Sequence, residues 1–365
     1  MPLAAGGKQT KSVNNMKEIN IGSRKVGPGY PVYLVAEIGS NHCRDKTIVK
    51  KLIDIAADIG FDAVKFQTYD PLEVFSGKIT TRDVHYEEMY GYRPWWEVAR
   101  DHILMPREWF GEMFDYARKK KLQVFSTAHS PTDVEFIMQF DPPVFKVASL
   151  DVSYTDFLAH LATFKKPILL STGMHYLGEI ETAKDTIKNA GNNQVILLHC
   201  VSNYPPQPGA VNLRNIPMLA QTFDVPVGLS DHSMDNYTAV AAVPLGACVI
   251  EKHVTLDRNF KGPDHAFALD PVGMRDLVKG VRETEKTMGS YHRVLSESEM
   301  KARKMARRSI VAKTSIEKGT VFTRENVKIS RPGNGIHPKY LDQLLGRKAA
   351  ANIEKEEIIS WDMLE

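Results

Sequence analysis

Two lysines of the sequence lie inside apolar runs, where a buried ammonium group without an anionic partner would be costly. Lys65 occurs in AVKFQ and Lys146 occurs in VFKVAS. If both face one cavity, they would bind a multiply charged anion such as a phosphate or a carboxylate. We expect the hydroxyl groups of Thr127, Ser149 and Ser230 to complete the hydrogen bonds to that anion.

Two histidines end neighbouring apolar runs. His232 lies in GLSDHS and His253 in VIEKHVTLD. Neutral imidazoles side by side are good ligands for a divalent transition metal. Either histidine alone could be an ordinary core residue, but the pair together with Asp231 and Glu251 favours a metal site. A metal at such an open site would act as a Lewis acid on a carbonyl oxygen.

Further polar residues follow the other apolar runs. Glu37 and Asp151 are carboxylates that could transfer a proton or orient water, and structural ion pairing is the equal alternative. His199 in LLHC could be a ligand or a buried imidazole whose hydrogen bonds are satisfied. Tyr204 in SNYPPQP is better explained as part of a site wall than as a catalyst.

The elements that must hold these residues are eight short apolar runs separated by helix-like amphipathic segments. The runs cover residues 32–37, 62–67, 122–127, 144–149, 167–172, 195–200, 226–231 and 247–253. The spacing is regular except for an insertion after the second run. This pattern predicts an α/β fold, a (β/α)₈ TIM barrel, with a doubly wound open sheet as the alternative. In a barrel the carboxyl ends of the strands meet at one rim, where the active site is expected.

The composition excludes several classes of protein. With 365 residues, 43% hydrophobic and 25% charged, and a formal net charge of +3, the chain resembles a folded globular protein of two domains. We find no nucleic-acid-binding motif, no nucleotide-binding glycine loop and no apolar stretch long enough for a membrane span or a signal peptide. Three cysteines without CxxC spacing suggest a reducing compartment. We therefore expect a cytoplasmic enzyme with small anionic substrates, no nucleic-acid partner and no membrane contact.

The composition along the chain predicts four parts. Residues 1–17 are a flexible leader, and residues 18–289 form the barrel domain with an N-terminal hairpin. Residues 290–305 are a charged linker. Residues 306–365 form a small α+β module, which is marginal on its own and is expected to dock on another surface.

Many short motifs, in order, resemble the sialic acid synthase family, also called the N-acetylneuraminate or nonulosonate synthases. The resemblance extends over residues 18–365, and its C-terminal part resembles the antifreeze-protein-like (SAF) domain of that family. The motifs are AEIGSNH, VKFQTY, FSTAHS, FKVASLD, LSTGM, LLHCVSNYP, GLSDHS, IEKHVTLD, KGPDHAFALDP, RRSIVAKTSIEKGT and RPGNGIHP.

This resemblance implies a transferase that condenses phosphoenolpyruvate with an open-chain N-acetylated amino sugar, giving a nine-carbon 2-keto sugar acid and phosphate. It implies a divalent cation, Mn²⁺ or alternatively Mg²⁺ or Co²⁺, held by His232 and His253. Glu37 and Asp151 would lie near the reacting carbons, and Asp151 stands where bacterial members often have Glu. The implied phosphoenolpyruvate contacts are Lys65, Thr127, Lys146, Ser149, Ser202 and Ser230, and the implied sugar contacts are Gln67, Tyr204 and Asp264.

The resemblance also implies a homodimer with swapped C-terminal domains, in which Arg331 of RPGNG reaches over the barrel of the other subunit. N-acetylmannosamine is the first choice of acceptor sugar. A 2,4-diacetamido-trideoxy hexose, the acceptor of legionaminate and pseudaminate synthases, is the second. Two other classes are less favoured: a barrel that binds sugar acids without turnover, and an aldolase that forms a Schiff base on one desolvated lysine without a metal.

Overall fold

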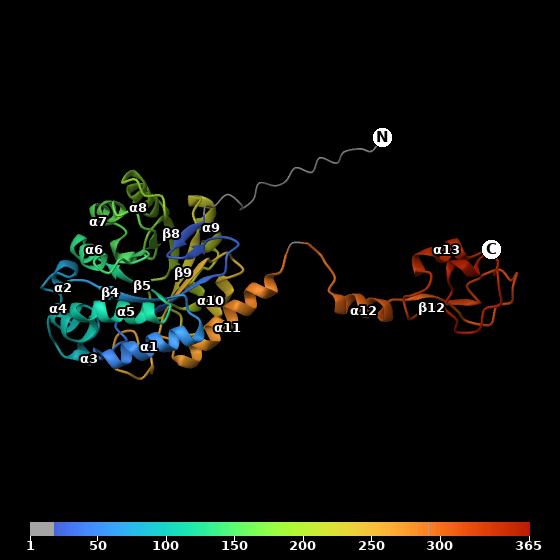
Figure 1. Cartoon of the computed structure of the whole chain (residues 1–365), viewed down its shortest axis with the longest axis horizontal. Coiled ribbons are helices and arrows are strands. Elements are labelled where there is room, and N and C mark those ends of the chain that lie inside the picture. The colour runs from blue at the N-terminus through green and yellow to red at the C-terminus, as the bar shows by residue number, and fades with distance from the viewer. Residues whose placement is uncertain (1–17, 291) are drawn as a thin grey trace. The chain divides into compact units, whose positions relative to one another are not determined.

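A computed structural model describes residues 18–290 and 292–365 of the chain. The predicted leader, residues 1–17, lies outside the described residues. Two compact units are separated between Gly289 and Ser290, and Figure 1 traces the chain through both.

The first unit is a closed barrel of eight parallel strands, which confirms the predicted (β/α)₈ fold. The strands follow one another around the barrel in chain order, and β10 closes it by pairing with β3. Each strand falls within or close to its predicted apolar run. The strands are β3 (Tyr33–Glu37), β4 (Ala63–Thr68), β5 (Gln123–Ala128), β6 (Phe145–Val147), β7 (Ile168–Ser171), β8 (Val195–Cys200), β9 (Val227–Asp231) and β10 (Val249–His253).

Eight helices of the barrel unit follow the eight strands, and Figure 1 shows them around the sheet. The side chains of Asp45, Ser130 and Asp270 cap the amino-terminal ends of α1, α6 and α11. The helices are α1 (Lys46–Ile59), α5 (Phe110–Lys119), α6 (Pro131–Met138), α7 (Thr155–Ala162), α8 (Leu177–Asn189), α9 (Asn215–Phe223), α10 (Tyr237–Ala242) and α11 (Pro271–Met288).

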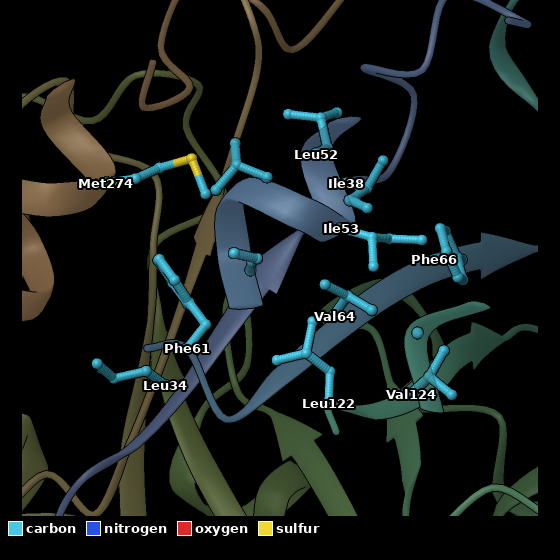
Figure 2. Close-up of a cluster of buried hydrophobic side chains, with 14 of the residues drawn as sticks. Leu34, Ile38, Leu52, Ile53, Phe61, Val64, Phe66, Leu122, Val124 and Met274 are labelled. Atoms are coloured by element: carbon cyan, nitrogen blue, oxygen red, sulfur yellow. The ribbon is translucent and has the colours of Figure 1, made fainter. Parts of the chain in front are cut away.

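Side chains along each barrel strand alternate between the outer side, facing the helices, and the inner side of the barrel. On β4, Val64 and Phe66 face outward and pack with Leu52 and Ile53 of α1, as Figure 2 shows. The neighbouring positions point inward, where Tyr33, Val35, Ala63, Phe125, Leu169 and Ile196 are among the residues that fill the amino-terminal part of the barrel. The inward positions that come later on the same strands therefore point into the carboxyl-terminal mouth.

An N-terminal hairpin closes the other end of the barrel. Strands β1 (Ile19–Ile21) and β2 (Arg24–Val26) pair antiparallel. Their buried side chains Ile19, Ile21 and Val26 belong to the same apolar cluster as the inner barrel residues. The barrel is thus packed solid at this end, and the polar residues collect at the other.

The segment between β4 and α5 is the predicted insertion. It contains α2 (Pro71–Val74), α3 (Glu87–Tyr90), α4 (Trp95–Val98), the wide helical turn η1 (Ala99–Ile103) and the 3₁₀ turn η2 (Arg107–Trp109). An apolar cluster of its own, built on Trp95, Val98 and Ile103 and partly covered by Phe75 and Tyr86, holds most of it together.

Within the second unit, the first helix is α12 (Glu297–Ala306), which lies almost entirely in the segment predicted as a linker. Ser296 and Glu299 form a capping box at its start. The module that follows has strands β11 (Ser309–Ala312) and β12 (Val327–Ser330), paired antiparallel, helix α13 (Leu341–Leu344), and the 3₁₀ turns η5 (Pro338–Tyr340) and η6 (Trp361–Met363). In the described part of the chain, no helix combines the length and apolar character needed to cross a membrane.

Candidate active site

The carboxyl-terminal mouth of the barrel holds a cavity lined by side chains from all strands except β3 and by residues of the insertion. Most of the predicted site residues lie in its wall, and they come from positions two residues apart on the strands, as the pleat requires. The predicted residues in the wall are Lys65, Gln67, Thr127, Lys146, Ser149, Tyr204, Ser230, His232, His253 and Asp264. Arg331 lies exposed in the second unit, directly after β12.

The floor of the cavity is a cluster of buried charges. Lys65 Nζ lies 2.7 Å from Glu37 Oε2 and donates a hydrogen bond to Thr127 Oγ1 at 2.9 Å. Glu251 Oε1 lies between the two lysines, 3.7 Å from Lys65 Nζ and 3.6 Å from Lys146 Nζ. Beyond Glu251, Lys146 Nζ has a long contact of 3.4 Å with the carbonyl oxygen of Val147. The positive charge of Lys146 is therefore less well neutralised by nearby carboxylates than that of Lys65.

The protonation of this cluster follows from burial and charge. Burial opposes the charge of Lys65, but Glu251 and Glu37 outweigh it and raise the pKa of Lys65. Burial lowers the pKa of Lys146, which Glu251 offsets only in part. Burial raises the pKa of Glu37 to about 7 against the influence of Lys65, whereas the two lysines outweigh burial and lower the pKa of Glu251. An incoming anion would stabilise the charged form of Lys146.

Gly39 allows Glu37 and the predicted sugar contacts to converge. Its φ of +48° lies in the left-handed region, and a Cβ there would be 2.9 Å from Glu37 Oε1 and 3.1 Å from Gln67 Nε2. Gln67 Nε2 donates to Glu37 Oε1 at 2.8 Å, and Ser40 Oγ donates to Asp264 Oδ2 at 2.8 Å. The AEIGSNH motif thus positions Glu37, Gln67 and Asp264 together.

The two histidines lie side by side at the mouth, with ring centroids 5.4 Å apart. Burial, with the charge of the neighbouring ring, lowers the pKa of His232 to about 3. Burial, with the charge of Lys65, likewise lowers the pKa of His253 to about 3. Both imidazoles are therefore neutral, which is the form that binds metal ions.

The histidine pair fits a divalent cation with an open coordination sphere. His253 Nδ1 is buried and has no hydrogen-bond partner, and Asp264 Oδ2 is 3.6 Å from it. Among residues 18–290 and 292–365, no group of three or more His, Cys, Asp or Glu side chains gathers as a closed metal cage would. An ion between these two imidazoles would take its remaining ligands from water or substrate.

Two residues that the sequence associated with the rim face away from the cavity. Asp231 was expected beside the histidines, but it points to the outer side of the sheet. There it accepts a hydrogen bond of 2.5 Å from Lys252 Nζ, which also donates to the carbonyl oxygen of Ser233. His199 Nε2 lies 2.6 Å from the carbonyl oxygen of Val211, so His199 is a satisfied buried imidazole. Each is the direct sequence neighbour of a residue that points into the cavity, and successive side chains of a strand point to opposite sides.

The hydroxyl groups of two serines, Ser149 and Ser202, converge at Gly173. The amide of Gly173 donates to Ser149 Oγ at 3.0 Å, and a Cβ at Gly173 would collide with Ser202 Oγ and lie 2.9 Å from Ser149 Oγ. Ser202 Oγ is buried and lacks a hydrogen-bond partner. Nearby, Ser230 Oγ donates to Glu251 Oε1 at 3.2 Å. This hydroxyl cradle can hydrogen-bond an anion oxygen or a water molecule.

Aromatic side chains of the insertion form one wall of the cavity, and the sequence did not reveal them as site residues. Tyr69, Phe75, Tyr86 and Trp95 line it, together with the aliphatic side chain of Ile103. The insertion has no strand end to mark it. The only signal available was its unusual density of aromatic residues, in segments such as YGYRPWW.

A buried pair, His129 and Asp151, completes the site. His129 Nδ1 lies 2.8 Å from Asp151 Oδ2, and His129 lines the cavity while Asp151 lies behind it. Sequence reasoning did not select His129, nor did it give Glu251 its place between the lysines. In both cases the available signal was a separation of two residues from a predicted site residue, which places both side chains on the same side of an extended chain. His129 is two residues after Thr127, and Glu251 is two residues before His253.

Comparison with known proteins agrees with this geometry. The model of the NeuB family matches residues 52–293, and the model of the SAF domain matches residues 307–365. The chain belongs to the NeuB family. Family membership makes it a condensing enzyme of the sialic acid synthase type, as its motifs predicted.

Relatives in the NeuB family carry different specificities. The N,N'-diacetyllegionaminic acid synthase of Campylobacter jejuni is 36% identical, covering 89% of this chain and 98% of that protein. A pseudaminic acid synthase of the same species is also 36% identical, covering 88% and 94%. The solved N-acetylneuraminic acid (sialic acid) synthetase of Leptospira borgpetersenii serovar Hardjo-bovis superimposes with a TM-score of 0.69 at 30% identity, covering 79% and 95%. Equal identity to two different synthases does not select one amino sugar.

The two lysines are predicted to respond differently to substitution. Lys65→Met leaves Glu37 and Glu251 without their shared cation, so the free energy of unfolding should fall by about 3 kcal/mol. Lys146→Met should cost less than half of that, but it should abolish the rise in melting temperature that phosphate produces in the wild type. Thermal unfolding with and without phosphate measures both effects. Lys119→Met, on the exposed end of α5, is the control, and a phosphate response in Lys146→Met equal to that of the wild type would contradict the anion role.

Proposed function

We propose that this protein is a nonulosonate synthase that condenses phosphoenolpyruvate with an open-chain N-acetylated amino sugar and releases phosphate. The observation that carries the proposal is the placement of two buried lysines around one shared carboxylate, next to two neutral imidazoles, in one barrel mouth. An anion-binding floor beside a cation-binding pair is the combination that this condensation requires.

In the proposed reaction the floor of the cavity binds phosphoenolpyruvate. Lys65 and Lys146 neutralise its phosphate and carboxylate, and the hydroxyls of Thr127, Ser149, Ser202 and Ser230 accept or donate the remaining hydrogen bonds. Holding both anionic groups fixes the direction of C3, the carbon that attacks. Gln67, Tyr204 and Asp264 lie toward the mouth and would contact the sugar, so that its aldehyde carbon meets C3.

The remaining chemistry is proton transfer. After C3 has bonded to the aldehyde carbon, water adds to C2, and the C2–O bond to phosphate breaks. Glu37, whose pKa is raised to about 7 by burial, can hold or release a proton near neutral pH. Its contacts with Lys65 and Gln67 keep that carboxyl group beside the reacting carbons.

His232 and His253 would hold a divalent cation, proposed to be Mn²⁺ with Mg²⁺ or Co²⁺ as alternatives, which supplies Lewis acidity toward the aldehyde oxygen. The contribution of the protein is to keep both imidazoles neutral and adjacent. The ring of Tyr204, with its centroid 4.2 Å from that of His232, and Phe267, at 5.2 Å from His253, restrain the two rings.

N-acetylmannosamine is the first proposed acceptor, because the GPDH and RPGNG motifs resemble the neuraminate or legionaminate type. One observation favours a 2,4-diacetamido-trideoxy hexose as the second candidate. Phe75 and Ile103 form an apolar part of the wall, and a deoxygenated carbon with its methyl group would lose less hydration against that part than a hydroxyl-bearing carbon.

Phosphate release tests the proposed function directly. We expect release from phosphoenolpyruvate with Mn²⁺ to require an N-acetylated amino sugar, and one of the two candidate acceptors to have a kcat/KM at least about tenfold above the other. The assay is inorganic phosphate formation across a panel of both sugars and unacetylated controls. Inactivation by pyruvate and borohydride would favour the Schiff-base aldolase instead, and sugar-acid binding without turnover would favour the binding protein.

The histidine pair provides a second test. His232→Ala or His253→Ala should abolish metal-dependent turnover, since one imidazole cannot hold the ion alone, while circular dichroism and melting temperature stay near wild type. Metal content after dialysis against Mn²⁺ and turnover after chelation and re-addition measure this. Full activity in either variant would refute the ligand assignment.

We also propose a homodimer with swapped C-terminal domains, in which Arg331 of one subunit completes the sugar site of the other. Two features support this: Arg331 is exposed on its own unit, and the apolar core of that unit is small. A guanidinium group is suited to hydrogen-bonding several sugar oxygens at once.

Arg331→Ala should raise the KM for the sugar at least about tenfold, the loss of one charged hydrogen bond, without changing metal content. Arg324→Ala, on the same unit, is the control. A mixture of Lys146→Met and Arg331→Ala dimers, exchanged under mild denaturant, should regain about a quarter of wild-type activity if the domains are swapped. An arginine acting within its own subunit would restore none.

A further inference from the structure

We infer that His129, oriented by Asp151, is the acid–base catalyst that handles the water added to C2 and the departing phosphate. The inference rests on the proposed function and deepens it. The proposed reaction gives roles to the two lysines, Glu37 and the histidine pair, but none to His129. The inference assigns His129 a catalytic role.

The geometry of the pair is that of a histidine held by a carboxylate. His129 and Asp151 are 8% and 6% exposed, and His129 Nδ1 lies 2.8 Å from Asp151 Oδ2. Because an ionised carboxylate only accepts hydrogen bonds, the proton resides on Nδ1, and Nε2 keeps its lone pair. His129 lines the cavity and Asp151 does not, so the imidazole separates the carboxylate from the substrate space.

The ring of His129 is held from several sides. The ring of Tyr69 meets it edge-on with centroids 5.1 Å apart. The backbone amide of His129 donates to Asp133 Oδ2 at 3.3 Å, and Asp133 is itself fixed by Arg107 at 2.7 Å. The titratable groups found against His129 are therefore Asp151, Tyr69 and Asp133. Contacts that fix both the ring and the backbone are typical of a residue that must keep a precise orientation.

The pair lies next to the anion-binding floor. His129 comes directly after the end of β5 and follows Thr127 by two residues, so the extended chain carries it roughly 7 Å further toward the mouth. Both residues line the cavity. Thr127 accepts the hydrogen bond of Lys65 and is paired with Lys146 of β6. Asp151 likewise follows Ser149 in one 3₁₀ turn, η3 (Ser149–Asp151). An imidazole at this height can reach a water molecule beside C2 and an oxygen of the bound phosphate.

The proposed step balances. As the water oxygen bonds to C2, Nε2 of His129 takes one proton of that water, and Asp151 stabilises the imidazolium. As the C2–O bond breaks, the imidazolium returns that proton to the oxygen leaving with phosphate. The second proton of the water leaves the C2 hydroxyl as the ketone forms and ends on the oxygen of the former aldehyde. Asp151 acts through His129 and is a positioning residue.

The test uses the full-length enzyme and separates chemistry from binding. His129→Asn retains an amide nitrogen near the place of Nδ1, which can still donate to Asp151, but it cannot transfer a proton. We expect kcat to fall at least about 100-fold, with the KM of both substrates within about threefold and the melting temperature unchanged. His85→Asn, exposed on the insertion, should behave as wild type.

Asp151→Asn provides an independent arm. Its amide can donate to Nδ1 and so moves the proton to Nε2, which removes the base. The double variant with His129→Asn should be no slower than His129→Asn alone, because the two residues act as one unit.

Three outcomes would overturn the inference while leaving the proposed function intact: a wild-type kcat in His129→Asn, a rise confined to the KM of the sugar, or additive losses in the double variant. A wild type that releases no phosphate with any acceptor would instead refute the proposed function, and this inference with it.

Discussion

The sharing of Glu251 between Lys65 and Lys146 is the interaction on which the site depends. Charges buried this deeply are tolerated only where each has a partner at close range. Here two ammonium groups face one firmly ionised carboxylate and a second, Glu37, that is readily protonated. The balance leaves positive charge at the floor. The packed apolar layer beneath keeps out water, so that this charge acts on an anion through a low dielectric.

The fold could be predicted from the sequence because parallel barrel strands are apolar on both faces and end in polar residues. These runs are visible without any structure, and all eight agree with the observed strands. Elements that do not form a continuous apolar run were harder to predict from the sequence. Helix α12 has no buried residue and a charged sequence, so it looked like a linker, and its start depends on a capping box rather than on an apolar face.

The sequence predicted which residues lie at the strand ends, but not which of them point into the barrel mouth and which point to the outer side of the sheet. Asp231 and His232 are neighbours in sequence, yet only His232 points into the cavity, because a strand sends successive side chains to opposite sides. Glu251 and His129 show the reverse: each is two residues from a recognised site residue and shares its face. If every second residue at each strand end is assigned to the inner side, Asp231 is excluded from the site, and Glu251 and His129 are included. The aromatic wall had no such rule, since it belongs to an irregular segment.

The aromatic wall is built on an apolar cluster of its own, distinct from the clusters that hold the barrel together. Substitutions there can repack one side of the cavity without disturbing the strands that carry the lysines and histidines. Under the proposed function, substitutions in this wall would alter acceptor preference while the residues proposed to bind phosphoenolpyruvate stay unchanged, which offers a physical reason why one scaffold serves synthases that make different sugar acids.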